Sequence, residues 1–176
     1  MAILLITMSL SGCGGTDLTE QDRELRSSIE KRGLKVQNFR RVNNSLKFTL
    51  FNKQGEGFGT RNIMNLKNPN PSNPEINKVV GRLGMILGLL TRQFKNRNRG
   101  TKDRIELMEV TIPDHRKKKL VILKINQSSV SLAENMRTMS KAKKGRLFQE
   151  VLQFNPDNKA GRVLKEAIEE AYGVTL

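Results

Sequence analysis

The fold is decided by PEINKVVGRLGMILGLLTRQF, residues 74–94. Its apolar residues recur every three or four positions, which is the period of an amphipathic α-helix. Pro74 suits the first position of a helix, and Glu75 suits the positive end of the helix dipole. We therefore predict a helix over roughly 75–95 that forms the spine of the hydrophobic core.

Three glycines lie inside this predicted helix, at Gly81, Gly84 and Gly88. Each costs about 1 kcal/mol relative to alanine in a helix interior. Such a cost is offset when another element packs closely on the glycine face. We expect a sheet or a second helix to pack against these glycines.

Two predicted β-hairpins lie on either side of the central helix. Residues 34–42 and 46–50 are strand-like and are separated by the turn residues Asn43-Asn44. Residues 105–112 and 120–125 form a second pair of strands, joined by a short polar turn. Strands joined by short turns pair antiparallel, so we expect an antiparallel sheet.

Three further helices complete the prediction. Thr19 and Asp22 form an N-terminal cap for a helix over roughly 19–32. The Ser131–Glu134 capping box opens a helical region that continues to residue 154, and a last helix covers about 159–172. The expected fold is α+β with antiparallel hairpins and about four helices in the order α-β-β-α-β-β-α-α, as one basic domain over residues 16–176.

Residues 1–15 are set apart from this domain by an apolar run from Ala2 to Leu10. The following residues, Leu10-Ser11-Gly12-Cys13, resemble the lipobox of bacterial lipoproteins. This resemblance implies cleavage before Cys13 and lipidation of its thiol. No Lys or Arg precedes the apolar run, although a secretory signal begins with positive charge. A short buried strand or an apolar tail is therefore the favoured interpretation.

Positive charge dominates the composition of the chain. Its 176 residues include 32 Lys and Arg against 17 Asp and Glu, a formal net charge of +15. The excess lies in residues 34–155, which hold 25 basic residues against 8 acidic ones. Such an excess indicates a folded basic surface and a polyanionic partner, and nucleic acid is the leading candidate.

Three basic clusters are the candidate binding residues. They flank the second hairpin, so we expect them to converge on one face and to neutralise successive phosphates. The predicted nucleic-acid-binding residues are Arg92, Lys95, Arg97, Arg99, Lys102, Arg104, Arg116, Lys117, Lys118, Lys119, Arg137, Lys141, Lys143, Lys144 and Arg146.

The rare residue types narrow the possible chemistry. Cys13 is the only cysteine and His115 the only histidine, which excludes an intrachain disulfide and a Cys/His zinc site. We predict no catalytic residue, cofactor or metal site, although Asp103, Glu109 and Asp114 leave a metal-dependent nuclease as a further hypothesis.

We therefore expect a non-enzymatic protein that binds nucleic acid largely independently of sequence, with RNA favoured, in the cytoplasm or a virion. The alternative is a membrane-associated structural protein with anionic lipid as its partner. It would be either of viral matrix type or a lipoprotein anchored at Cys13.

Overall fold

The structure is a computed structural model that describes residues 17–66, 70–133 and 138–176. The apolar N-terminal segment with Cys13, and Arg137 of the third basic cluster, lie outside the described residues. The elements are α1 (Glu20–Glu30), β1 (Leu34–Val42), β2 (Ser45–Asn52), the short 3-10 helix η1 (Ile63–Asn65), α2 (Pro74–Asn98), β3 (Leu107–Pro113), β4 (Lys119–Ile125), α3 (Gln127–Ala133), α4 (Lys141–Val151), β5 (Leu152–Phe154) and α5 (Lys159–Tyr172).

The described residues form an α+β fold around one mixed sheet with the strand order β1-β2-β3-β4-β5. Both predicted hairpins are present, and each is antiparallel. The prediction of a wholly antiparallel sheet is wrong, because β2 and β3 pair in parallel. The 25 residues of α2 carry the chain back to the starting end of the sheet, as a parallel pair requires.

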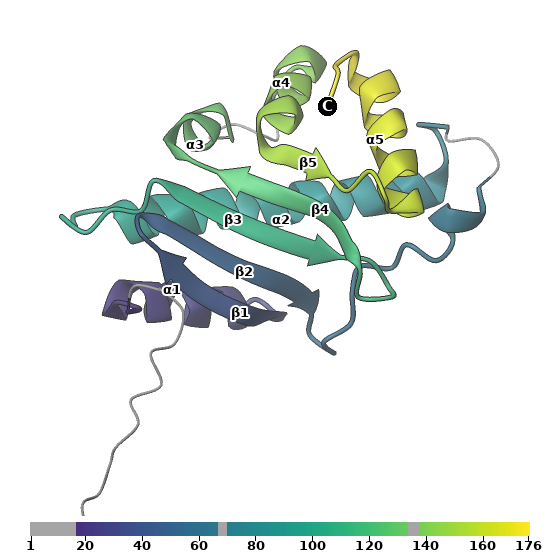
Figure 1. Ribbon diagram of the computed structural model, residues 1–176. Coiled ribbons are helices and arrows are strands. Elements are labelled where there is room, and N and C mark those ends of the chain that lie inside the picture. Colours follow the sequence, from purple (N-terminus) through teal and green to yellow (C-terminus); the bar gives the residue numbers. More distant parts are fainter. Residues whose placement is uncertain (1–16, 67–69, 134–137) are drawn as a thin grey trace, which may run out of the picture.

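One face of the sheet packs on helices and holds the core. Leu46, Phe48 and Leu50 of β2 alternate with outward-facing residues, and each is nearly inaccessible to solvent. Figure 1 shows α1 and α2 behind the sheet and no described helix in front of β1, β2 and β3. No described helix therefore covers the front face of these three strands.

The central helix is confirmed and runs slightly longer than predicted. Asn73 caps it by accepting a hydrogen bond from the backbone N–H of Glu75 at 2.9 Å, and Pro74 occupies its first turn. The expectation of close packing on the glycines is wrong at Gly81. This residue is exposed, and a methyl group added there would meet nothing within 4 Å.

The region after β4 differs most from the prediction. Helix α3 already begins at Gln127, because Asn126 and Ser129 form a reciprocal cap with two bonds of 2.9 Å. A separate helix, α4, starts behind the cap residue Ser140. The end of the predicted helix is instead strand β5, paired with β4. The described residues thus contain five α-helices and five strands, rather than four of each.

Candidate nucleic-acid interface

The three basic clusters occupy different parts of the fold. The first lies at the C-terminal end of α2 and in the following loop, the second in the β3–β4 turn, and the third on α4. Strand β3 separates the first two clusters, and its 7 residues span about 20 Å at roughly 3.3 Å per residue. The structure therefore places these two clusters at opposite ends of the sheet, not around one point.

Arg97 of the first cluster does not face solvent. Its side chain is 0% exposed, and its Nε donates to Oδ1 of Asp22 at 2.7 Å. Its Nη2 donates to Oδ2 of Asp103, also at 2.7 Å. A guanidinium held in this way cannot reach a phosphate outside the protein, so we leave Arg97 out of the interface.

Arg41 completes an ion cluster that the sequence analysis did not anticipate and that is buried except for Asp103, whose side chain is 39% exposed. Its guanidinium donates two hydrogen bonds to the Asp103 carboxylate, and its Nη1 lies 3.4 Å from Oδ2 of Asp22. The four side chains of this ion cluster carry two positive and two negative charges. They join α1, β1, α2 and the loop before β3 into one electrostatic unit.

The ion cluster strongly favours the charged form of Asp103. The hydrogen bond from Arg41, followed by that from Arg97, holds the pKa of the Asp103 carboxyl well below its usual value, although burial acts in the opposite direction. The hydrogen bond between Arg41 and Asp103 likewise raises the pKa of the Arg41 guanidinium. The pair of Arg41 and Asp103 is therefore ionised at neutral pH.

The loop of residues 99–106 is fixed by hydrogen bonds on both sides of Asp103. The side chain of Asn98 makes two hydrogen bonds to the backbone of Ile105. Its Nδ2 donates to the carbonyl at 2.7 Å, and its Oδ1 accepts from the N–H at 2.9 Å. The N–H of Glu106 donates to the carbonyl of Asn44 at 2.7 Å. We call this segment the pinned loop. It presents three exposed cations, Arg99, Lys102 and Arg104.

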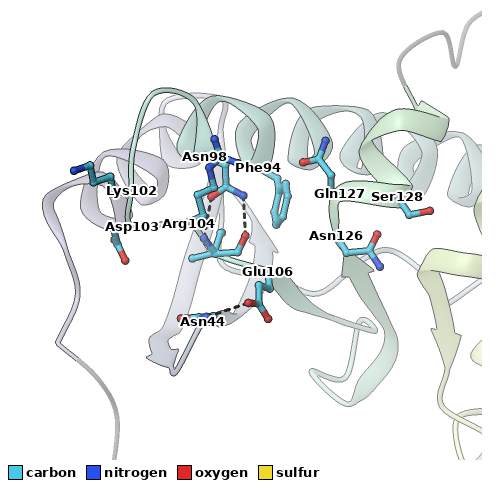
Figure 2. A pocket seen from close by; sticks show the side chains of 11 residues that line it. Asn44, Phe94, Asn98, Lys102, Asp103, Arg104, Glu106, Asn126, Gln127 and Ser128 are labelled. Atoms are coloured by element: carbon cyan, nitrogen blue, oxygen red, sulfur yellow. Dashed lines mark hydrogen bonds between the residues drawn. The ribbon is translucent and has the colours of Figure 1, made fainter.

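A pocket of about 710 Å³ opens beside the pinned loop. Figure 2 shows Lys102, Asp103 and Arg104 on one side of it, Gln127 and Ser128 on the other, and Phe94 between them. Two side-chain amides that line the pocket already donate hydrogen bonds, Asn98 to the carbonyl of Ile105 and Asn44 to the carboxylate of Glu106. Its lining residues are Asn44, Phe94, Asn98, Lys102, Asp103, Arg104, Ile105, Glu106, Asn126, Gln127 and Ser128.

The other predicted cations that the structure describes are exposed, except for the half-buried Lys144. Arg116 to Lys119 are all exposed on a tight turn, which is held by the buried carboxylate of Asp114. This carboxylate accepts from the N–H groups of Arg116 at 2.8 Å and Lys118 at 2.9 Å. On α4, Lys144 is half-buried, and the exposed cations are Lys141, Lys143 and Arg146.

Further features of the described residues concern metal ligands, His115 and membrane-spanning helices. No three His, Cys, Asp or Glu side chains there come together as a metal site would require. His115 is half-buried with its Nδ1 3.0 Å from Oγ1 of the buried Thr60. None of the helices in the described part of the chain is both long and apolar enough to cross a membrane.

The chain was also compared with protein-family models, curated proteins and solved structures, and none of these comparisons gave a match. An α+β fold alone does not identify a function, because function depends on the residues of a site. The function must therefore be inferred from the charges, contacts and exposure of the chain's own residues.

Proposed function

We propose that the protein binds nucleic acid largely independently of sequence, with RNA favoured, through contacts from Lys and Arg to phosphates. One observation carries the proposal: Arg99, Lys102 and Arg104 are exposed on a loop that a buried ion cluster holds in place. Within the described residues, none of these three side chains forms an ion pair with a carboxylate.

The nearby carboxylates leave a net positive charge on the loop. Asp103 is paired with Arg41 and Arg97, and Glu106, which accepts a hydrogen bond from the neutral amide of Asn44, contributes one negative charge against the three cations. The remaining positive charge of the loop is balanced by ions from solution. A nucleic acid that replaces those ions releases its own condensed counter-ions, which makes binding favourable and strongly dependent on salt.

The pinned loop also lowers the cost of binding. Its backbone is already ordered by Asn98, Asp103 and Glu106. Ordering a flexible loop on binding would consume part of the interaction free energy, and a loop that is ordered beforehand avoids this loss. Arg92 and Lys95, exposed on the preceding turns of α2, extend the same basic surface.

Anionic membrane is the alternative partner, favoured by the lipobox resemblance at Leu10–Cys13. A lipid-anchored protein with basic loops would bind anionic lipid by the same long-range attraction. Mass spectrometry of the protein from its native host would distinguish this alternative. Cleavage before Cys13 and a lipid on its thiol would support it, whereas intact Met1 and an unmodified thiol would contradict it.

The proposal is tested by binding of the full chain to oligouridylate, duplex DNA and vesicles containing phosphatidylserine, each across a salt series. The loop variant carries Arg99→Gln, Lys102→Gln and Arg104→Gln. Its matched control removes two Arg and one Lys, all exposed, before α2 or on its N-terminal half: Arg61→Gln, Lys78→Gln and Arg82→Gln.

We expect tight binding of the wild type to nucleic acid and weaker binding to vesicles. The loop variant should lower the slope of log K against log salt by about 0.7 per cation removed on a single strand. The control should keep most of the wild-type slope. An unchanged slope in the loop variant, or a preference of the wild type for vesicles, would contradict the proposal.

A further inference from the structure

The open face of the sheet carries a row of charged side chains that the sequence analysis did not single out. Strand pairing places Arg40 beside Lys47, Lys47 beside Glu109, and Glu109 beside Lys124. Neighbouring residues that pair across strands project to the same face. This charged row therefore crosses β1, β2, β3 and β4 with three cations and one carboxylate.

Two cations of the charged row have no ion-pair partner among the residues that the structure describes. Lys47 Nζ lies 3.4 Å from Oε2 of Glu109, so these two charges largely cancel. Arg40 and Lys124 are exposed and have no ion-pair partner within the described residues. The row therefore offers two free positive charges, separated by the widths of β2 and β3.

A second row lies next to the charged row and consists of uncharged polar side chains except for Ile122 on β4. The pairing aligns Gln37 with Thr49, Thr49 with Thr111, Thr111 with Ile122, and Ile122 with Gln153. Hydroxyl and amide groups of this kind commonly contact phosphate and sugar oxygens. The open face thus combines free cations with neutral hydrogen-bonding groups.

The sheet is also hollowed where the two rows meet. A depression of about 410 Å³ lies there. Strand β1 bulges beside it, because two of its residues, Asn38 and Phe39, lie opposite Phe48 of β2. Asn38 in the bulge has a positive φ of 53°, which Asn adopts more readily than most other residues, and β-bulges are over-represented next to active sites. The lining residues are Asn38, Phe39, Arg40, Lys47, Phe48, Thr49, Glu109 and Thr111.

This face lies between the two basic loops at the ends of β3. The pinned loop precedes the strand, and the turn of Arg116 to Lys119 follows it about 20 Å away. We propose that a single strand of nucleic acid lies along this face between the two loops, with Arg40 and Lys124 contacting its phosphates. The inference rests on the proposed nucleic-acid-binding function and identifies the form of the ligand.

A single strand fits this face better than a duplex. The major groove is about 12 Å wide and admits a helix or a two-stranded ribbon, whereas this face spans at least four strands at about 4.8 Å each. A single strand can follow a flat surface instead. Neither row contains an aromatic side chain on which bases could stack. Phosphate contacts should therefore dominate, with little sequence preference.

The test compares the full chain carrying Arg40→Gln and Lys124→Gln with a control carrying Lys78→Gln and Arg82→Gln. The control pair is also one Lys and one Arg, exposed on α2, which lies behind the sheet. The probes are oligouridylate of about ten nucleotides, within the usual range of single-strand site sizes, and a duplex of equal length. Thermal unfolding of each variant verifies that the fold is intact.

We expect the sheet-face variant to lower the salt slope for oligouridylate by about 0.7 for each of its two substitutions, and the control to leave it unchanged. We also expect the wild type to bind the duplex more weakly than oligouridylate. A wild-type slope in the sheet-face variant, or equal affinity for the duplex, overturns the inference while the proposed function stands. If the wild type binds neither nucleic acid, both fail together.

Discussion

Substituting asparagine for Asp22 removes one negative charge from the buried ion cluster. The Asp22 side chain is 0% exposed and accepts from Nε of Arg97 at 2.7 Å, from Nη1 of Arg41 at 3.4 Å and from the N–H of Thr19 at 3.1 Å. In Asp22→Asn, one of these acceptor positions becomes an amide donor. Arg41 and Arg97 are then left with Asp103 as their only carboxylate.

The expected loss of stability follows from this uncompensated charge. Breaking a buried ion pair by removing one partner costs about 3–5 kcal/mol. A chain of this size loses about 2–4 °C of melting temperature per kcal/mol, so the midpoint should fall by roughly 6–20 °C. Because the total stability of a domain is about 5–15 kcal/mol, the loss is a large fraction of it.

Urea denaturation of the full chain measures this effect, with Glu24→Gln as the matched control. Glu24 is an exposed carboxylate on the same helix, and its substitution should change the free energy of unfolding by less than about 0.5 kcal/mol. In the double variant Asp22→Asn with Arg97→Met, the neutral pair of Arg41 and Asp103 remains. The double variant should therefore lose less stability than the two single losses added together.

A loss of less than about 1 kcal/mol in Asp22→Asn would refute this reasoning, since that is the range of solvent-exposed ion pairs. It would mean that water or a relaxed backbone compensates the guanidinium groups of Arg41 and Arg97. The pinned loop could then not owe its position to the ion cluster.

Three further predictions concern pH, glycine and a helix cap. The hydrogen bonds and ion pairs of Asp103 lower its pKa, so the stability that they provide is complete above the unfolded pKa of about 3.9 and is lost as pH falls through the folded pKa. Urea titrations should show that Asp103→Asn has a lower free energy of unfolding than the wild type, and that this difference shrinks below about pH 4. A difference that does not depend on pH would contradict this prediction. Gly57→Ala should lower the free energy of unfolding in urea by about 3 kcal/mol or more, because the new Cβ would lie 1.6 Å from the carbonyl oxygen of Asp114. Gly81→Ala should raise the free energy of unfolding by up to about 1 kcal/mol, because a Cβ there meets nothing within 4 Å. Equal effects at the two sites would contradict the packing argument. Asn158→Ala removes the N-cap of α5 and should lower the thermal midpoint by the equivalent of about 0.5–2 kcal/mol, and an unchanged midpoint would show that the cap is dispensable.

The elements that the sequence predicted well are those defined by local signals. Helix α2 has a cap, a proline in its first turn and an apolar period, all within its own residues. The parallel pairing of β2 and β3 has no such signal, because it depends on where a long connection returns the chain. The Asn126–Ser129 cap was missed because its second residue is Ser and not the Glu or Gln of the sequence rule. The position of this cap depends on where β4 ends.

The candidate site divides in the same way. The exposed cations of the pinned loop were predicted from composition, but Arg97 was assigned wrongly to the surface. The burial of Arg97 could have been predicted from sequence, because Leu90, Phe94 and Arg97 are spaced four and three residues apart. They therefore lie on the same buried face of α2. Arg40 and Lys124 could not be grouped from sequence, since their common row requires the register of four strands.

The buried ion cluster is better explained by the loop it positions than by the stability it adds. Apolar residues of similar volume often replace a buried ion pair without loss of stability, so ion pairing alone is weak evidence for a stabilising role. Here one carboxylate, Asp103, comes from the pinned loop, between Lys102 and Arg104 in the sequence. Ion pairing of Asp103 with Arg41 and Arg97 leaves its two neighbours exposed, and it engages the carboxylate that lies nearest to them in the sequence. The cluster thus fixes both the geometry and the uncompensated charge on which the proposed interface depends.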